Sequence, residues 1–317
     1  MSLADIIAQV SSLPEVAAWP EMARLFERSV TGLNIKWELP LVACRTVGGD
    51  ESTAIAGAAA VACMQLSLML VDDMLDEDPR GVYVWLGCAN SANLAFAFQA
   101  TAFRLIEGAP VEVERRAAVY AILAQMALTS AFGQNLDAQN LSGEEIYWQI
   151  VRTKSAPFFG ASLQIGALLG QASCEVVEHM HDFGLLIGEV IQIYDDLLDS
   201  LETPAGPDWK QGRNNLAILY ALTADHPDRT QFRALLSKVD DPQALKSAQK
   251  IMIRCGAVSY CAYQVFERYK VGLRLLNSLS LADPSPLRDL LARQVEPLGT
   301  LLASVGMENP STWGELI

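Results

Sequence analysis

Long apolar stretches interrupted by single polar positions run along most of the chain, and they predict helices. These stretches are rich in Ala, Leu, Met, Glu and Gln, and they lack the strict alternation of apolar and polar residues that marks a half-buried strand. Gly, Pro and small polar clusters separate them, at positions where helices usually end. The five longest predicted helices span residues 52–78, 91–108, 113–140, 143–171 and 175–201. The pattern therefore predicts an all-α protein.

The first of these helices is apolar on almost every side between Ser52 and Leu75, as expected for a helix in the middle of a bundle. No shift in composition and no long linker divides the chain. We therefore expect a single helical domain that spans residues 1–317.

Composition excludes some classes of partner. Hydrophobic residues make up 51% of the 317 positions, the net charge is −14, and no block rich in Lys or Arg is present. A surface that binds nucleic acid or anchors to anionic lipid needs such a block, so neither is expected. No uninterrupted apolar run approaches the roughly 20 residues that cross a bilayer. We predict a cytoplasmic protein without stable membrane insertion.

Two acidic clusters with the same spacing follow apolar stretches. Each cluster has the order Asp-Asp-x-x-Asp, and the members are Asp72, Asp73 and Asp76 in the first and Asp195, Asp196 and Asp199 in the second. On a helix, positions i, i+1 and i+4 lie at about 0°, 100° and 40°, so we expect the three carboxylates of a cluster to point to one side.

Carboxylates gathered this closely repel one another and raise one another's pKa unless a cation neutralises them. Mg²⁺ suits the arrangement, because it prefers one or two carboxylates together with water and phosphate oxygens. Two such clusters that face each other across a bundle would hold a pyrophosphate between metal ions.

At these motifs the chain resembles the trans-isoprenyl diphosphate synthases, the head-to-tail prenyltransferases of the class I isoprenoid synthase superfamily. "LMLVDDMLDEDPRG" and "GEVIQIYDDLLD" are similar to the first and second aspartate-rich motifs of that family. "GQNLDAQN" is similar to its Gln-x-x-Asp element, and "RTKSAPFFGASLQIGALLG" to its Lys-Thr segment. The resemblance implies a helical bundle around a central apolar cavity, and a homodimer.

The resemblance also implies roles for individual residues. The expected catalytic residues are Asp72, Asp73, Asp76, Lys154, Gln192, Asp195, Asp196 and Asp199, with all six aspartates as metal ligands. The expected substrate-binding residues are Lys36, Gln65, Ser67, Leu68, Arg80, Ser155 and Arg213. Three Mg²⁺ ions are expected to bind with an allylic prenyl diphosphate, which ionises to an allylic cation.

The chain departs from the family where isopentenyl diphosphate is gripped. "NIKWELP" keeps Lys36 but has Leu39 at the position of an Arg, and "DEDPRG" offers only Arg80 where the family has a pair of arginines. Paired guanidinium forks and Lys charge are what hold a diphosphate, so this subsite is expected to be weakened. Whether Arg45 or Lys210 replaces the missing charge is not decided by the sequence.

Three functions therefore remain open. Chain elongation with isopentenyl diphosphate is favoured by the second aspartate motif, and the product would be a trans-polyprenyl diphosphate. A terpene synthase, or a prenyltransferase to another acceptor, is favoured by the missing basic residues. A regulatory subunit of a heteromeric synthase is disfavoured, because all six aspartates are present. In relatives the positions of Ser67 and Leu68 form the floor of the tail pocket, and the small Ser67 indicates room for a product of about C15 to C20 or longer.

Overall fold

A computed structural model describes residues 3–32 and 36–304, and every regular element in these ranges is a helix. The all-α prediction is confirmed. The first two residues of "NIKWELP" lie outside the described residues. The elements are α1 (Leu3–Ser11), α2 (Pro14–Ala17), α3 (Pro20–Gly32), α4 (Leu39–Thr46), α5 (Glu51–Leu75), α6 (Tyr83–Leu86), α7 (Cys88–Glu107), α8 (Val113–Asp137), α9 (Glu144–Ile150), the π-helix η1 (Val151–Ser155), α10 (Ala156–Leu169), α11 (Cys174–Leu201), α12 (Pro207–Gln211), α13 (Leu216–Thr223), α14 (Arg229–Leu236), α15 (Pro242–Arg254), α16 (Ala257–Ser278) and α17 (Ser285–Ser304).

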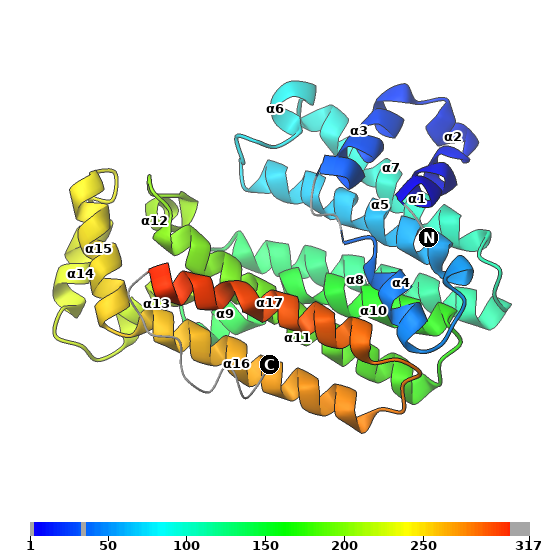
Figure 1. Ribbon diagram of the computed structural model, residues 1–317. Coiled ribbons are helices and arrows are strands. Elements are labelled where there is room, and N and C mark those ends of the chain that lie inside the picture. Colours follow the sequence, from blue (N-terminus) through cyan, green and yellow to red (C-terminus); the bar gives the residue numbers. More distant parts are fainter. Residues whose placement is uncertain (1–2, 33–35, 305–317) are drawn as a thin grey trace.

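The long helices form a bundle, with α14 and α15 at one end and α1 to α3 on the opposite flank (Figure 1). Helix α10 lies inside this bundle and packs against α4, α5, α8 and α11. Helix α5 begins at Asp50, whose side chain accepts a hydrogen bond from the Ser52 N–H. Its middle is buried on all sides, and Asp76 caps its C-terminal end. The first acidic cluster therefore lies at the end of a core helix.

The segment 143–171 differs from the single helix that its sequence predicts. It is divided into α9, the π-helix η1 and α10. Pro157 explains the division, because it has no N–H to donate to the carbonyl of Thr153 one turn earlier. A short π-turn is a common local solution and often occurs at functional sites.

Two glycines allow neighbouring helices to approach η1 closely. A Cβ atom on Gly133 of α8 would lie 2.3 Å from the Lys154 backbone nitrogen. A Cβ atom on Gly188 of α11 would lie 2.6 Å from the Cα of Ala156. Larger residues do not fit at either position, so α8 and α11 enclose the turn that carries Lys154 and Ser155.

Two helices of the described residues, α5 and α8, are long and apolar enough to cross a membrane by length and composition alone. This corrects our expectation that no stretch comes close to that limit. The apolar window of α5 is 72% buried within the bundle, which a core helix of a folded domain explains equally well. A cytoplasmic location and the absence of membrane insertion stay predictions.

Candidate functional site

Two cavities adjoin at the centre of the bundle. One has a volume of about 480 Å³, is mainly polar, and is lined by both acidic clusters. The other has a volume of about 570 Å³, is mainly apolar, and lies among α5, α7, α8, α10 and α11. We call them the polar cavity and the apolar cavity. Five residues line both of them, namely Asp72, Lys154, Ser155, Gln192 and Asp195.

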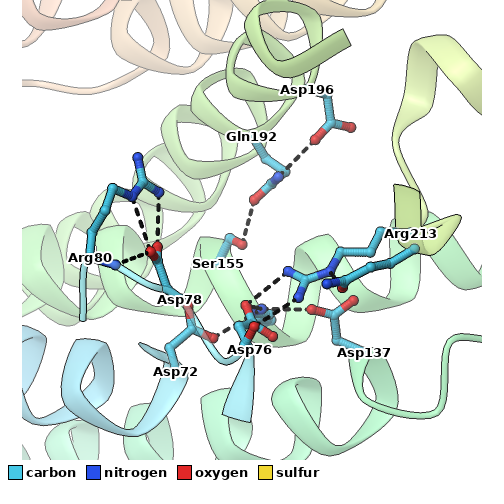
Figure 2. A network of polar contacts seen from close by, with 11 residues as sticks. Asp72, Asp76, Asp78, Arg80, Asp137, Ser155, Gln192, Asp196 and Arg213 are labelled. Carbon is cyan, nitrogen blue, oxygen red and sulfur yellow. Dashed lines mark hydrogen bonds and ion pairs between the residues drawn. The ribbon is translucent and has the colours of Figure 1, made fainter. Parts of the chain in front are cut away.

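Lys154 is the centre of a charge cluster in the polar cavity. Its Nζ lies 2.6 Å from Asp137 Oδ2, 3.0 Å from Asp72 Oδ1 and 3.8 Å from Asp76 Oδ2. Arg213 also pairs with one of these carboxylates, with a guanidinium nitrogen 3.2 Å from Asp76 Oδ2 (Figure 2). Two basic and three acidic side chains thus share this part of the polar cavity.

The surroundings shift the pKa values in this cluster. Burial alone would lower the pKa of Lys154, but the carboxylates of Asp72, Asp137 and Asp76 raise it above its usual range. Burial raises the pKa of Asp72, and the charge of Lys154 opposes that effect. Lys154 is therefore fully charged at neutral pH and holds Asp72 closer to its ionised form.

The second acidic cluster lines the polar cavity from α11. Burial, together with Asp199, raises the pKa of Asp195 to about 6. Burial, Asp208 and Glu202 raise the pKa of Asp199 to about 6 as well. Such shifts are expected where carboxylates gather without a neutralising cation.

Asp196 has a different environment from its two neighbours. It is 3% exposed, its Oδ2 accepts the Leu216 N–H at 2.8 Å, and its Oδ1 accepts Gln192 Nε2 at 2.9 Å. Burial raises its pKa to about 7 although these hydrogen bonds lower it. Oδ2 thus joins α11 to the first residue of α13, and Oδ1 is held by Gln192 of α11 itself, so Asp196 forms part of the cavity wall.

Asp73 departs from the expectation that all three carboxylates of a cluster point to one side, whereas Asp195, Asp196 and Asp199 all line the polar cavity. Asp73 lines neither cavity, and burial, Asp78 and Asp72 raise its pKa to about 6. The rotation of about 100° from Asp72 carries the Asp73 side chain away from the direction that Asp72 and Asp76 share.

Gln192 and Ser155 lie where the two cavities meet. Ser155 Oγ donates a hydrogen bond to Gln192 Oε1 at 2.7 Å, and the Gln192 amide in turn donates to Asp196 (Figure 2). This chain fixes the orientation of the Gln192 amide. The Ser155 Oγ and Gln192 Oε1 atoms, which belong to neutral groups, therefore lie where the polar cavity meets the apolar cavity.

Every predicted site residue other than Asp73 lines one of the cavities. The predicted substrate-binding residues of the apolar cavity are Lys36, Gln65, Ser67, Leu68 and Ser155, and those of the polar cavity are Arg80, Ser155 and Arg213. The Lys36 N–H donates to Gln65 Oε1 at 2.8 Å, which joins the two sides of the apolar cavity. Arg80 is largely exposed and pairs with Asp78 at 2.8 Å.

Neither Arg45 nor Lys210 supplies the cavities with a replacement positive charge. Leu39, at the position of the missing Arg, is 4% exposed and belongs to the core. Arg45 pairs with Glu51 at 2.9 Å and Lys210 pairs with Asp240 at 3.1 Å, and neither lines either cavity. Among the described residues, the basic side chains that line the two cavities are Lys36, Arg80, Lys154 and Arg213.

The resemblance of "GQNLDAQN" to the Gln-x-x-Asp element rests on Gln134 and Asp137, and both line the cavities. Tyr147 and Asn214 also line the polar cavity and were not predicted, because no sequence motif marks them. The Ser130 Oγ and Gln134 Nε2 atoms are buried in the apolar cavity and have no hydrogen-bond partner in the protein. Buried polar atoms nearly always have partners, so these two indicate a space that a ligand fills.

The acidic residues of the polar cavity suit Mg²⁺ better than a metal ion that is coordinated entirely by protein side chains. Among residues 3–32 and 36–304, no group of three or more His, Cys, Asp or Glu side chains is placed to hold a metal unaided. Mg²⁺ needs only one or two carboxylates, with water and phosphate oxygens completing its shell. Asp72 and Asp76 on one side and Asp195 and Asp199 on the other provide such pairs.

Metal binding and activity are expected to fall as the pH falls through about 6. Asp195 and Asp199 have pKa values of about 6, so their carboxylates accept protons in this range and the protons compete with the metal.

The raised pKa values of Asp195 and Asp199 also affect the stability of the metal-free protein. Between about pH 4 and 6 the folded protein binds more protons than the unfolded chain, so these two groups lower the free energy of unfolding as the pH rises. Thermal unfolding at pH 5 and pH 8, with and without Mg²⁺, tests this. Equal stabilisation by Mg²⁺ at both pH values would contradict it.

Comparison with known proteins places these features in one family. A sequence profile of the polyprenyl synthetase family matches residues 24–252. A short chain isoprenyl diphosphate synthase from Methanothermobacter thermautotrophicus is 28% identical, over 83% of this chain and 86% of the relative. A nonaprenyl diphosphate synthase from Mycobacterium tuberculosis is 29% identical, over 78% of this chain and 76% of the relative.

The fold agrees with these sequence matches. The crystal structure of a geranylgeranyl pyrophosphate synthetase from Pyrococcus horikoshii superposes with a TM-score of 0.81 at 22% identity, and the match covers 92% of this chain and 95% of the other. The profile covers well over half of the chain, and the acidic motifs lie within it. The chain therefore belongs to the polyprenyl synthetase family and is a prenyltransferase of isoprenoid biosynthesis.

Proposed function

We propose that the protein transfers the prenyl group of an allylic diphosphate to isopentenyl diphosphate and so makes a longer trans-polyprenyl diphosphate. One observation supports this most directly. Acidic pairs from α5 and α11 line a polar cavity that adjoins an apolar one, and the two cavities share five lining residues. A molecule with a diphosphate head and a hydrocarbon tail matches this arrangement.

The proposed metal ligands are Asp72, Asp76, Asp195 and Asp199. Three Mg²⁺ ions bound with the diphosphate would supply the positive charge that stabilises the leaving pyrophosphate. Asp73 and Asp196 have supporting roles, because Asp73 lines neither cavity and the carboxylate oxygens of Asp196 are already bound by Leu216 and Gln192.

The protein's own groups assist the cleavage of the carbon–oxygen bond. Lys154 and Arg213 lie beside the acidic pairs and supply charge to the leaving oxygens. Ser155 and Gln192 present neutral oxygens at the junction of the cavities, where the allylic cation would form. The apolar walls, among them Phe158, exclude water from that cation.

The apolar cavity is open enough for a long tail. Ser67 and Leu68 both line it, with Met69 next to them. Its volume of about 570 Å³ supports a product of about C15 to C20 or longer. The names of the two relatives, short chain and nonaprenyl, show that membership of the family leaves the length open.

A second function is favoured by the distribution of charge. The basic residues of the apolar cavity among the described residues are Lys36 and Lys154, and Lys154 is held by three carboxylates. A second diphosphate thus meets little positive charge there. This favours an enzyme that uses the allylic diphosphate alone, as a terpene synthase does, or that transfers the prenyl group to another acceptor.

The decisive experiment supplies Mg²⁺ and geranyl or farnesyl diphosphate, with and without isopentenyl diphosphate, and identifies the products by mass spectrometry. Chain elongation predicts longer diphosphates only when isopentenyl diphosphate is present. Pyrophosphate release with a hydrocarbon or alcohol product, at a rate that isopentenyl diphosphate does not change, would favour the second function. No reaction of the allylic diphosphate in either mixture would contradict both.

We also propose that the protein is a homodimer. Helices α7 and α8 pack on each other and leave large apolar side chains exposed, including Phe96, Leu128 and Phe132. An interface with a second copy would cover such side chains. Light scattering at micromolar concentration should give twice the mass of 34.5 kDa, and a monomer at all concentrations would contradict the proposal.

A further inference from the structure

We infer that three charged residues outside the cavities, Arg152, Glu189 and Arg268, position Lys154 and Ser155 for the transfer reaction. We call them the Glu189 cluster. None of the three lines the polar or the apolar cavity, so they act through other residues. The inference rests on the proposed function only in so far as it concerns the rate of that reaction.

Glu189 is bound by two arginines at once. It is 8% exposed, its Oε1 accepts Arg152 Nε at 3.0 Å, and its Oε2 accepts Arg268 Nε at 2.6 Å. Arg268 is 9% exposed and its guanidinium also donates to the carbonyl and the side chain of Gln264. The same guanidinium lies 4.1 Å from the centre of the Trp148 ring. The cluster therefore connects η1, α9, α11 and α16.

The cluster forms one of two parallel connections between η1 and α11. Arg152 bonds Glu189, and three residues later Ser155 bonds Gln192, so both connections join positions 37 residues apart. They hold the two ends of the π-turn, and Lys154 lies between them. Because a π-turn is not held by the regular hydrogen bonds of an α-helix, its geometry depends on such external contacts.

Stability alone is a poor explanation for these charges. Removing charged groups from water is costly, and a buried ion pair can often be replaced by apolar residues without loss of stability. The two hydrogen bonds of Glu189 have preferred distances and angles, so they give the η1 turn a direction that does not depend on shape complementarity alone.

Arg152→Ala tests the inference with little risk to the fold, because the Arg152 side chain is 63% exposed. We expect kcat to fall about tenfold or more, because small displacements of catalytic groups have large effects on rate. We expect KM for the allylic diphosphate and the unfolding temperature to change little. Arg254→Ala is the matched control, since Arg254 is 64% exposed and pairs with one carboxylate, that of Asp228, away from the cavities.

A second variant separates positioning from stability. The double change Glu189→Met with Arg268→Met replaces the buried pair by apolar side chains, so the unfolding temperature should stay close to that of the wild type. We still expect the tenfold loss of kcat, and adding Arg152→Ala should cause no further loss, because the connection is already absent.

Hydrogen exchange at the amides of residues 151–155 gives a readout that does not depend on activity. Exchange should be faster in Arg152→Ala and in the double variant, and unchanged in Arg254→Ala. Wild-type kcat together with wild-type exchange in Arg152→Ala would overturn the inference. A wild-type protein without activity would instead count against the proposed function, and the exchange data would still decide the role of the cluster.

Discussion

Asp195→Asn is expected to lower kcat by about 10³-fold, equivalent to about 4 kcal/mol, while leaving the fold intact. Asp195 lines both cavities and its carboxylate is one of the proposed metal ligands. The change removes a charge from a crowded acidic cluster, in which burial and Asp199 already raise the pKa of Asp195. The unfolding temperature of the metal-free protein should therefore stay equal or rise slightly.

The neighbouring residue provides the contrast, because Asp196→Ala should act mainly on stability. It leaves the Leu216 N–H and the Gln192 amide without their carboxylate partner inside the bundle. The expected loss is about 3 kcal/mol of the free energy of unfolding. Denaturant unfolding and steady-state kinetics of both variants check the pair of predictions. Equal losses of activity and equal losses of stability would contradict the separate roles.

Lys154→Met is expected to reduce kcat/KM for the allylic diphosphate by about 10³-fold. The Lys154 ammonium group contacts Asp72, Asp76 and Asp137, and it lies at the junction of the two cavities. Without it, the three carboxylates repel one another and the leaving pyrophosphate loses a positive charge. We also expect Mg²⁺ to raise the unfolding temperature more in the variant than in the wild type, because the metal becomes the main neutralising charge.

Two further variants make this result interpretable. Lys210→Met removes a partly exposed charge that pairs only with Asp240, so it should leave kcat/KM unchanged. Asp137→Asn keeps Lys154 charged but weakens its 2.6 Å contact, and should reduce kcat/KM by about tenfold. A Lys154→Met variant with wild-type kinetics would show that Lys154 serves only to neutralise the aspartates.

The candidate site was largely predictable because its chemistry is local in sequence. Each acidic cluster lies within five consecutive positions, and the regular geometry of a helix brings its first and third members together. The two middle members nevertheless differ, because Asp73 lines neither cavity whereas Asp196 lines the polar cavity and accepts the Leu216 N–H. The difference arises from the surroundings, since α13 offers a backbone N–H to Asp196.

Contacts between distant segments were not predictable in the same way. The break of the segment 143–171 at η1 depends on Pro157, which is visible in the sequence, but also on the close approach of α8 and α11 at Gly133 and Gly188. Arg45 and Lys210 lie outside both cavities and pair with the carboxylates of Glu51 and Asp240, which the sequence does not reveal.

The sequence by itself determined the helical class, the family resemblance and the two acidic clusters, because each depends on residue types at short spacing. Only the tertiary structure decided which aspartates line the cavities, that Leu39 is a core residue, and that Arg152, Glu189 and Arg268 meet behind η1. Those outcomes depend on burial and on partners supplied by distant helices, and the free energy of a charged group is set by these surroundings as much as by its own chemistry.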